Sequence, residues 1–133
     1  MTLIEFINCH QQTPFTWGEH DCCLFAAKWI KAASKQDFAA DFVGRYKTAI
    51  GAKRLLSKKG FKCVADVATH YLGEPVGRLQ LKRGDIVLIK PPRHPKALGI
   101  FAGSNVYAVS EEGLSQLPVN LVEQGWRLPC HQS

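Results

Sequence analysis

The segment from Trp17 to Ile30 constrains the fold more than any other part of the chain, because a tight turn runs directly into an amphipathic helix. From Cys22 onward, apolar residues recur at the three- and four-residue spacing of one helical face. Asp21 precedes this run and can accept hydrogen bonds from the free N–H groups of the first turn. The pattern predicts a helix over roughly residues 22–34, with Asp21 as its N-cap and Cys22 in its first turn.

The position of Cys22 is one in which a thiol can be activated. A helix N-terminus offers unpaired N–H groups and a partial positive charge, and both favour the nucleophilic thiolate. The negative charge of Asp21 acts in the opposite direction. The residues alone leave two interpretations open: Cys22 is a nucleophile, or it is a small buried apolar side chain, as most free cysteines are.

The chain divides into a helical N-terminal part and a C-terminal part of strands. Caps and helical periodicity predict further helices over roughly residues 2–12, 49–59 and 63–72. After Pro75, five short apolar stretches are separated by turn residues, and they predict antiparallel strands. These stretches are residues 86–89, 98–102, 106–109, 114–119 and 126–128. Helices followed by strands predict an α+β fold in which the helix carrying Cys22 packs on the sheet.

Length and composition predict a single domain over residues 1–133, with 46% apolar and 21% charged residues. No stretch approaches the ~20 apolar residues of a membrane span, and the N-terminus shows no secretory signal. The five cysteines have irregular spacing without a C-x-x-C pair, so we expect reduced thiols, no metal site and no cofactor.

The Trp-Gly-x-x-Asp-Cys motif resembles the nucleophile motif of NlpC-type cell-wall peptidases, which are bacterial papain-like cysteine peptidases. Residues 83–88 resemble the Gly-Asp-Leu-Val segment of that superfamily, and residues 98–103 resemble its Val-Gly-Ile-Tyr-x-Gly strand. A small phage and prophage branch is most similar, through Trp-Gly-x-His-Asp-Cys, residues 42–46 and a late Gly-Trp-Arg. The resemblance implies a papain-like fold, with N-terminal helices packed on a C-terminal antiparallel sheet of about five strands.

The resemblance also implies an incomplete catalytic site. It assigns the role of nucleophile to Cys22, which in active members attacks a peptide bond of peptidoglycan. The general-base histidine of those members stands immediately before the Val-Gly-Ile strand, where this sequence has Ala97. The polar third member comes from the next strand, and residues 106–109 contain no His, Asn or Gln. The implied pocket residues are Trp17, Gly18, Asp21 and Ala97.

Two histidines are candidates for a substitute base. His94 lies in a proline-rich loop three residues before Ala97, and it would have to swing toward Cys22. His20 lies in the turn just before Cys22. A structural interpretation stays open for both, since His94 can be a plain exposed loop residue and His20 can hold the turn by hydrogen bonding.

Two functions follow from the resemblance. The first is a phage or prophage tail-assembly or tail-tip protein, a pseudoenzyme that has lost its catalytic histidine. Its partners would be other tail proteins, and it would pass from the host cytoplasm into the virion tail. The second is an active peptidoglycan-cleaving cysteine peptidase or amidase that uses Cys22 with His94, His20 or a partner's group as the base.

A third class, nucleic-acid binding, is not expected from the sequence. The basic residues between Lys53 and Lys62 are interpreted as a solvated face rather than an anion site. The chain has no helix-turn-helix or RNA-binding signature, and its positive charge looks spread rather than striped.

Overall fold

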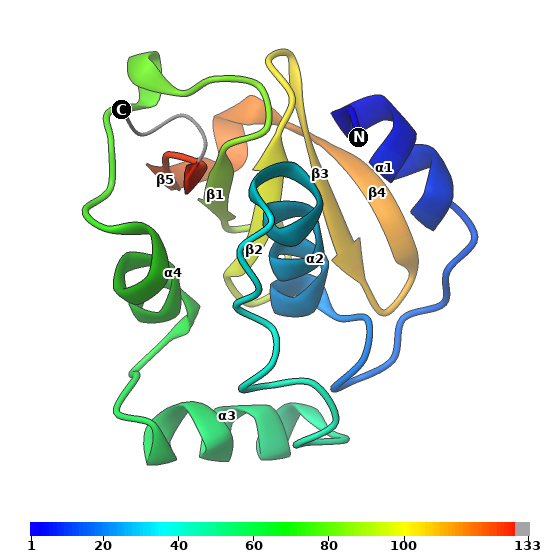
Figure 1. Cartoon of the computed structure of the whole chain (residues 1–133), viewed down its shortest axis with the longest axis vertical. Coiled ribbons are helices and arrows are strands. Elements are labelled where there is room, and N and C mark those ends of the chain that lie inside the picture. The colour runs from blue at the N-terminus through cyan, green and yellow to red at the C-terminus, as the bar shows by residue number, and fades with distance from the viewer. Residues whose placement is uncertain (130–133) are drawn as a thin grey trace.

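An antiparallel sheet with helices on one of its faces organises the chain. The computed structural model describes residues 1–129, which contain four α-helices and five strands. The helices are α1 (Leu3–His10), α2 (Cys22–Ser34), α3 (Ala49–Lys58) and α4 (Val64–Leu72). The strands are β1 (Ile86–Ile89), β2 (Ala97–Phe101), β3 (Asn105–Ser110), β4 (Gly113–Pro118) and β5 (Val122–Trp126). Figure 1 shows this arrangement, and it confirms the predicted α+β class.

The helices begin where the capping residues predict. Thr2 forms a capping box with Glu5, and the side chains of Asp21 and Thr48 accept backbone hydrogen bonds at the starts of α2 and α3. The last strand differs from the prediction, because β5 ends at Trp126 instead of running over residues 126–128. The polar residues Glu123 and Gln124 interrupt the apolar pattern within β5, so the sequence does not reveal this strand. Beyond the strand, the backbone N–H of Leu128 donates to the Asp85 carboxylate at 2.9 Å.

Both faces of the sheet are apolar. The strand order is β4-β3-β2-β1-β5, so β1 and β2 lie inside the sheet, and all four residues of β1 are buried. On one face, α2 packs against β2 and β3, where Phe25 and Trp29 join Leu98 and Ile100 in the main core. The opposite face carries a second cluster, whose buried members are Val87, Ile89, Val106, Ala108 and Val122.

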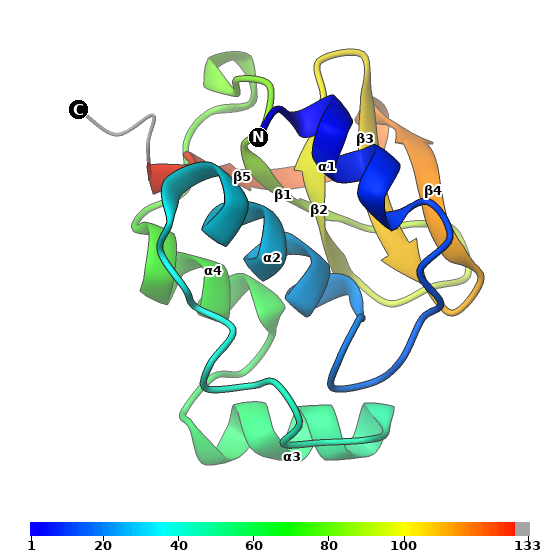
Figure 2. The same cartoon turned by 45° about the vertical axis from the view of Figure 1, so that its right-hand side comes forward.

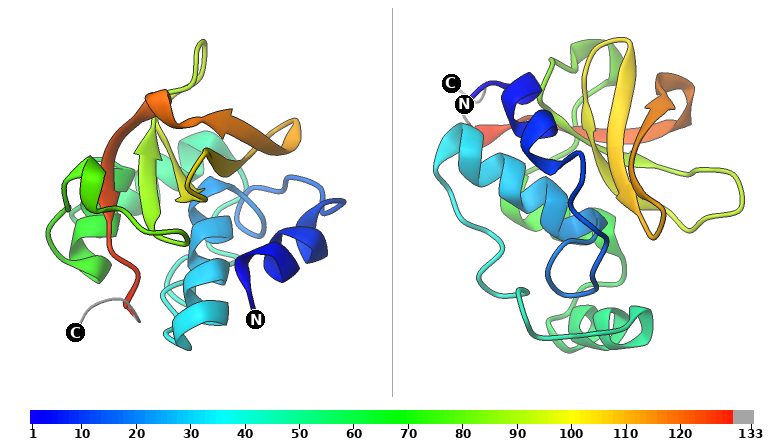
Figure 3. Two further views of the ribbon diagram at one scale, coloured as in Figure 1. Left: turned by 90° about the horizontal axis from the view of Figure 1, so that it is seen from above. Right: turned by 90° about the vertical axis from the view of Figure 1, so that its right-hand side faces the viewer.

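Helix α3 lies apart from the sheet, at one end of the molecule (Figures 1 and 2). None of its residues is fully buried. It is attached through a third apolar cluster, in which Leu55 and Leu56 pack near the buried rings of Phe42 and Tyr46. The side view in Figure 3 shows the same separation from α1 and the sheet. Within residues 1–129, no helix has the length and apolar character needed to cross a bilayer.

Replacement of Trp29 tests the packing of α2. Its side chain is 5% exposed, packs against Phe6, and donates from Nε1 to the Gly84 carbonyl at 2.7 Å. We expect Trp29→Ala to lower the free energy of unfolding by about 3–5 kcal/mol, because it removes a large core side chain. Trp29→Phe keeps most of the packing and should cost distinctly less. Urea denaturation measures both, and equal stability of Trp29→Ala and wild type would contradict this description of the core.

Candidate functional site

The carboxylate of Asp21 organises the start of α2. Asp21 is 1% exposed, and its two oxygens accept hydrogen bonds from the backbone N–H groups of Gly18 and Leu24, each at 3.0 Å. The hydroxyl of Tyr46 donates to the same carboxylate. Burial and this hydrogen bond raise the pKa of Tyr46 well above its ordinary value, so the phenol remains a donor. Asp21 therefore joins the turn, the helix and the loop that carries Tyr46.

Gly18 allows that loop to approach the turn closely. Its φ is +83°, and a Cβ at this position would lie 2.0 Å from the Tyr46 carbonyl oxygen. The Gly18 carbonyl also accepts a hydrogen bond from the Gly44 N–H at 2.8 Å. A side chain at position 18 would push residues 44–46 away and separate Tyr46 from Asp21. The Trp-Gly-x-x-Asp-Cys motif thus has a structural explanation that does not require catalysis.

Cys22 is the first residue of α2, as predicted, and its thiol reaches the start of β2. Its sulfur accepts a hydrogen bond from the backbone N–H of Leu98. The strand pairing leaves that N–H available, because β3 pairs only with Ile100 and Phe101 of β2. The first residues of β2 pair with β1 alone, and the edge they leave open faces the thiol.

Neighbouring donors tune the two adjacent thiols in opposite directions. The Cys23 thiol donates a hydrogen bond to the Cys22 sulfur, and this is the largest influence that lowers the pKa of Cys22. The Leu98 N–H acts in the same direction, whereas burial and the charge of Asp21 oppose it. The same hydrogen bond and burial raise the pKa of Cys23. Cys22 is therefore the thiol that ionises first, while Cys23 keeps its proton as the donor.

Cys22 lines a cleft of about 620 Å³ that is mostly apolar. The cleft lies between α2, α3, α4 and the start of β2, and the rings of Trp17 and Tyr46 contribute to its wall. The structure brings most of the predicted site residues into this one cleft. They are Trp17, Asp21, Cys22, His94 and Ala97.

The side chain of Ala97, which the resemblance places in the pocket of Cys22, packs with the second cluster on the face of the sheet opposite α2. Leu98 and Ile100 face α2 instead. Alternation predicts which residues share a face, and only tertiary packing decides which face the helix covers. Ala97 reaches the cleft because it is the first residue of β2, at the open end of the strand.

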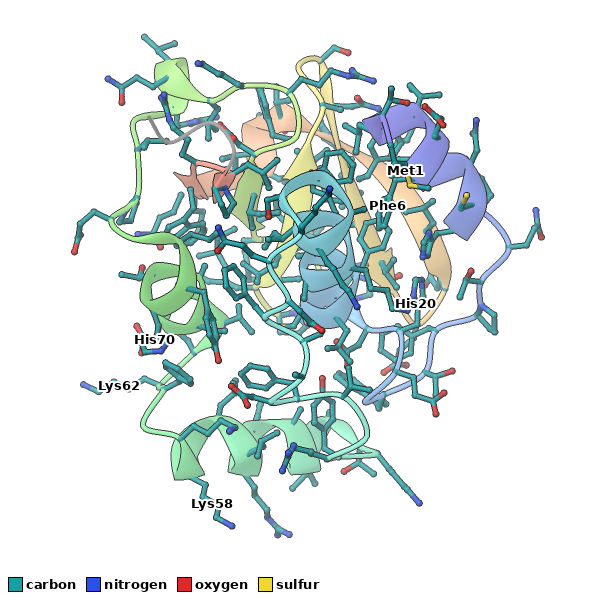
Figure 4. All side chains as sticks on the ribbon, viewed as in Figure 1. Met1, Phe6, His20, Lys58, Lys62 and His70 are labelled. Carbon is teal, nitrogen blue, oxygen red and sulfur yellow. The ribbon has the colours of Figure 1, made fainter. Side chains whose placement is uncertain are left out.

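His20 lies outside the cleft, on the side of α2 that faces α1. Figure 4 shows its ring near the last turn of α1, and it stacks on His10 with the ring centroids 5.4 Å apart. The Lys28 ammonium donates to Nδ1 of His20 at 2.9 Å. Burial, Lys28 and His10 lower the pKa of His20 to about 4. The imidazole of His20 is therefore neutral near pH 7, and its contacts with His10 and Lys28 give it a structural role in the turn.

The site contains a thiol of lowered pKa, and its chemistry depends on which group of the described residues could exchange a proton with a leaving group. Within residues 1–129, no hydrogen bond joins an imidazole to Cys22, although the exposed His94 lines the same cleft. In the same range, no cluster of His, Cys, Asp and Glu side chains could hold a metal ion. Such a thiol can react with an electrophile, but hydrolysis of an amide also requires protonation of the amine that leaves.

Sequence reasoning missed three contributors to this geometry. Tyr46 lies far from Asp21 in sequence, and only the Phe42–Tyr46 resemblance drew attention to its segment. Cys23 was not a candidate in the sequence, and a main-chain donor such as the Leu98 N–H has no side-chain signature at all. The spacing of Gly18 from Asp21 was the one available signal that a close backbone contact was needed here.

Comparison with known proteins identifies the family. A family model matches residues 1–128, and it is described as a domain of unknown function, DUF6950. The chain belongs to the DUF6950 family. A comparison with curated proteins finds no match. The match includes the motif from Trp17 to Cys22, Tyr46 and all five strands, so the DUF6950 domain contains the whole cleft described above.

Substitution of Cys23 tests the coupling between the two thiols. Cys23→Ala removes a hydrogen bond that contributes about 1 kcal/mol to stabilising the Cys22 thiolate. We therefore expect alkylation of Cys22 to be roughly fivefold slower in this variant near neutral pH. Cys23→Ser retains a hydroxyl donor and should react nearly as wild type does. Iodoacetamide labelling followed by peptide mass spectrometry measures the rate, with the exposed Cys9 as internal reference. Identical Cys22 rates in all three proteins would disprove the proposed donor role.

The buried His20 predicts a loss of stability at mildly acidic pH. Its pKa is about 4 in the fold and near 6.5 in the unfolded chain, so the unfolded chain binds the proton first. Stability is therefore complete above about pH 6.5 and falls as the pH drops toward 4. We expect a loss of about 2 kcal/mol between pH 7 and pH 5, measured by urea denaturation. His20→Asn should remove most of this dependence, and an unchanged pH profile would contradict it.

Proposed function

We propose that this DUF6950 domain is an NlpC-type papain-like domain of a phage or prophage that serves in tail assembly or at the tail tip. In this proposal the Cys22 cleft has become a groove that binds a partner, and the domain no longer hydrolyses peptide bonds. The partners are other tail proteins, and peptidoglycan is a possible second ligand of the groove. The domain would be located in the host cytoplasm during assembly and afterwards in the virion tail.

One observation carries the proposal: the first residue of β2, which lines the same cleft as Cys22, is an alanine and not a histidine. In NlpC-type peptidases, which this chain resembles, the nucleophile begins a helix and the general-base histidine stands immediately before the Val-Gly-Ile strand, where this chain has Ala97. Here the group of β2 that interacts with the Cys22 thiol is the main-chain N–H of Leu98, and no imidazole in residues 1–129 is hydrogen-bonded to that thiol. Triad hydrolases that lose their base lose orders of magnitude in rate.

The structure of the turn supports retention of the cleft without catalysis. Asp21 and Gly18 hold residues 44–46 against the start of α2, so they are needed for folding whether or not Cys22 reacts. The mostly apolar lining, with Trp17 and Phe15 in edge-to-face contact at 4.9 Å, suits binding of a protein segment better than of a charged small molecule.

The alternative is an active peptidoglycan peptidase or amidase. Two features favour it, namely the lowered pKa of Cys22 and the presence of His94 in the same cleft. For this function the loop carrying His94 would have to bring its imidazole to the sulfur. That loop holds three prolines, and the carbonyl of His94 accepts a hydrogen bond from Lys90 Nζ at 2.5 Å.

Digestion of purified sacculi distinguishes the two functions. We expect wild type and Cys22→Ala to release the same background of soluble fragments, because no imidazole in residues 1–129 is hydrogen-bonded to the thiol. His94→Ala serves as a second comparison. Release of peptide fragments by wild type that is abolished in Cys22→Ala would establish the peptidase and refute the pseudoenzyme. If His94→Ala also fails to release these fragments, His94 is the general base of the peptidase.

The tail role has a separate test in a phage or inducible prophage that carries this chain. We expect the chain in purified particles at a fixed ratio to other tail proteins, and normal infectivity when Cys22→Ala replaces wild type. Gly18→Val should fail to support assembly, since its side chain would collide with the Tyr46 carbonyl. Absence of the chain from particles together with normal tails in its deletion strain would overturn the tail role.

A further inference from the structure

The positive charge of the chain is concentrated in one segment. Residues 42–65 contain seven lysines and arginines and no acidic residue, whereas the remainder contains ten basic and eleven acidic residues. The formal charge of +6 therefore comes from this segment alone. Its basic residues are Arg45, Lys47, Lys53, Arg54, Lys58, Lys59 and Lys62.

The fold gathers these residues at one end of the molecule. We call this surface the basic end; it consists of α3 and its flanking residues 45–47 and 59–62. All seven basic residues are exposed, and in residues 1–129 none of them forms a salt bridge. Figure 4 shows Lys58 and Lys62 pointing away from the body of the protein. The positive charge is thus presented together on this surface, and the Asp66 carboxylate at its border accepts a hydrogen bond from the backbone N–H of Lys62 at 2.8 Å.

The chemistry of the basic end excludes several partners. Protein interfaces favour aromatic anchors and are poor in lysine, but Phe42 and Tyr46 are buried. A membrane-binding helix would turn its apolar face outward, whereas Leu55 and Leu56 of α3 pack inward and leave only Ile50 prominently exposed. Single-stranded nucleic acids bind by stacking on exposed aromatic rings, and the described part of the basic end presents none.

We propose that the basic end binds the phosphate backbone of double-stranded DNA without sequence preference. The DNA duplex carries one negative charge per about 1.7 Å of its axis, and a ten-residue helix spans about 15 Å. Flexible lysines around α3 can therefore contact several phosphates at once and release their counterions. The proposal differs from the expectation from sequence that nucleic acid is not a partner, and it is independent of the function proposed for the Cys22 cleft.

Salt-dependent DNA binding of the full chain tests the proposal. Fluorescence anisotropy with a labelled duplex of about 30 base pairs, from about 50 to 200 mM NaCl, gives affinity and salt dependence. Arg54→Gln/Lys58→Gln removes two charges from α3 and retains good helix formers. The matched control, Lys35→Gln/Lys82→Gln, removes two exposed charges elsewhere. We expect the first variant to bind at least about tenfold more weakly near 0.1 M salt, with a salt slope smaller by about 2.

The control should retain the wild-type slope and nearly the wild-type affinity. Circular dichroism and urea denaturation verify that both variants are folded. No binding at about 50 mM NaCl, or equal weakening in both variants, overturns the proposal, since the second result reports net charge alone. Unlabelled wall teichoic acid is a competing phosphate polymer. If it displaces the duplex at a lower phosphate concentration than unlabelled DNA does, the surface belongs to a wall polymer and the DNA proposal is wrong.

Discussion

The buried carboxylate of Asp21 is the interaction on which the arrangement of the cleft depends. It accepts hydrogen bonds from the turn at Gly18, from the first turn of α2 at Leu24, and from the hydroxyl of Tyr46. A buried carboxylate is costly unless its oxygens are satisfied, so these donors are required together. The start of α2, and with it the position of Cys22 opposite β2, follows from this one network.

Local patterns predicted the elements that local chemistry determines. The limits of α2 and β1 match the predicted ranges, because an N-cap and an uninterrupted apolar run are visible in the sequence. The prediction failed for β5, where polar residues interrupt the strand. The face of the sheet on which Ala97 lies could not be predicted either, because alternation along β2 is symmetrical and cannot tell which side a helix will cover.

The electrostatics of the thiol could not be predicted from the helix start alone. The helix N-terminus and Asp21 act in opposite directions on Cys22, and neither is the largest influence. The balance is set by the Cys23 thiol, while the Leu98 N–H contributes because β3 leaves the beginning of β2 unpaired. Donors of this kind stabilise a thiolate but cannot relay a proton to a leaving group as an imidazole can. A lowered thiol pKa is therefore compatible with the proposed loss of peptidase activity.

Tyr46 connects the cleft to the basic end. Its hydroxyl binds Asp21, while its ring belongs to the third apolar cluster, through which Leu55 and Leu56 attach α3. Lys53 of α3 also lines the cleft, so the two surfaces meet along this helix. Because α3 buries none of its residues fully, that cluster carries much of the apolar attachment of α3 to the rest of the chain. The hydrogen bond that fixes the thiol and the packing that fixes the basic surface thus share one side chain.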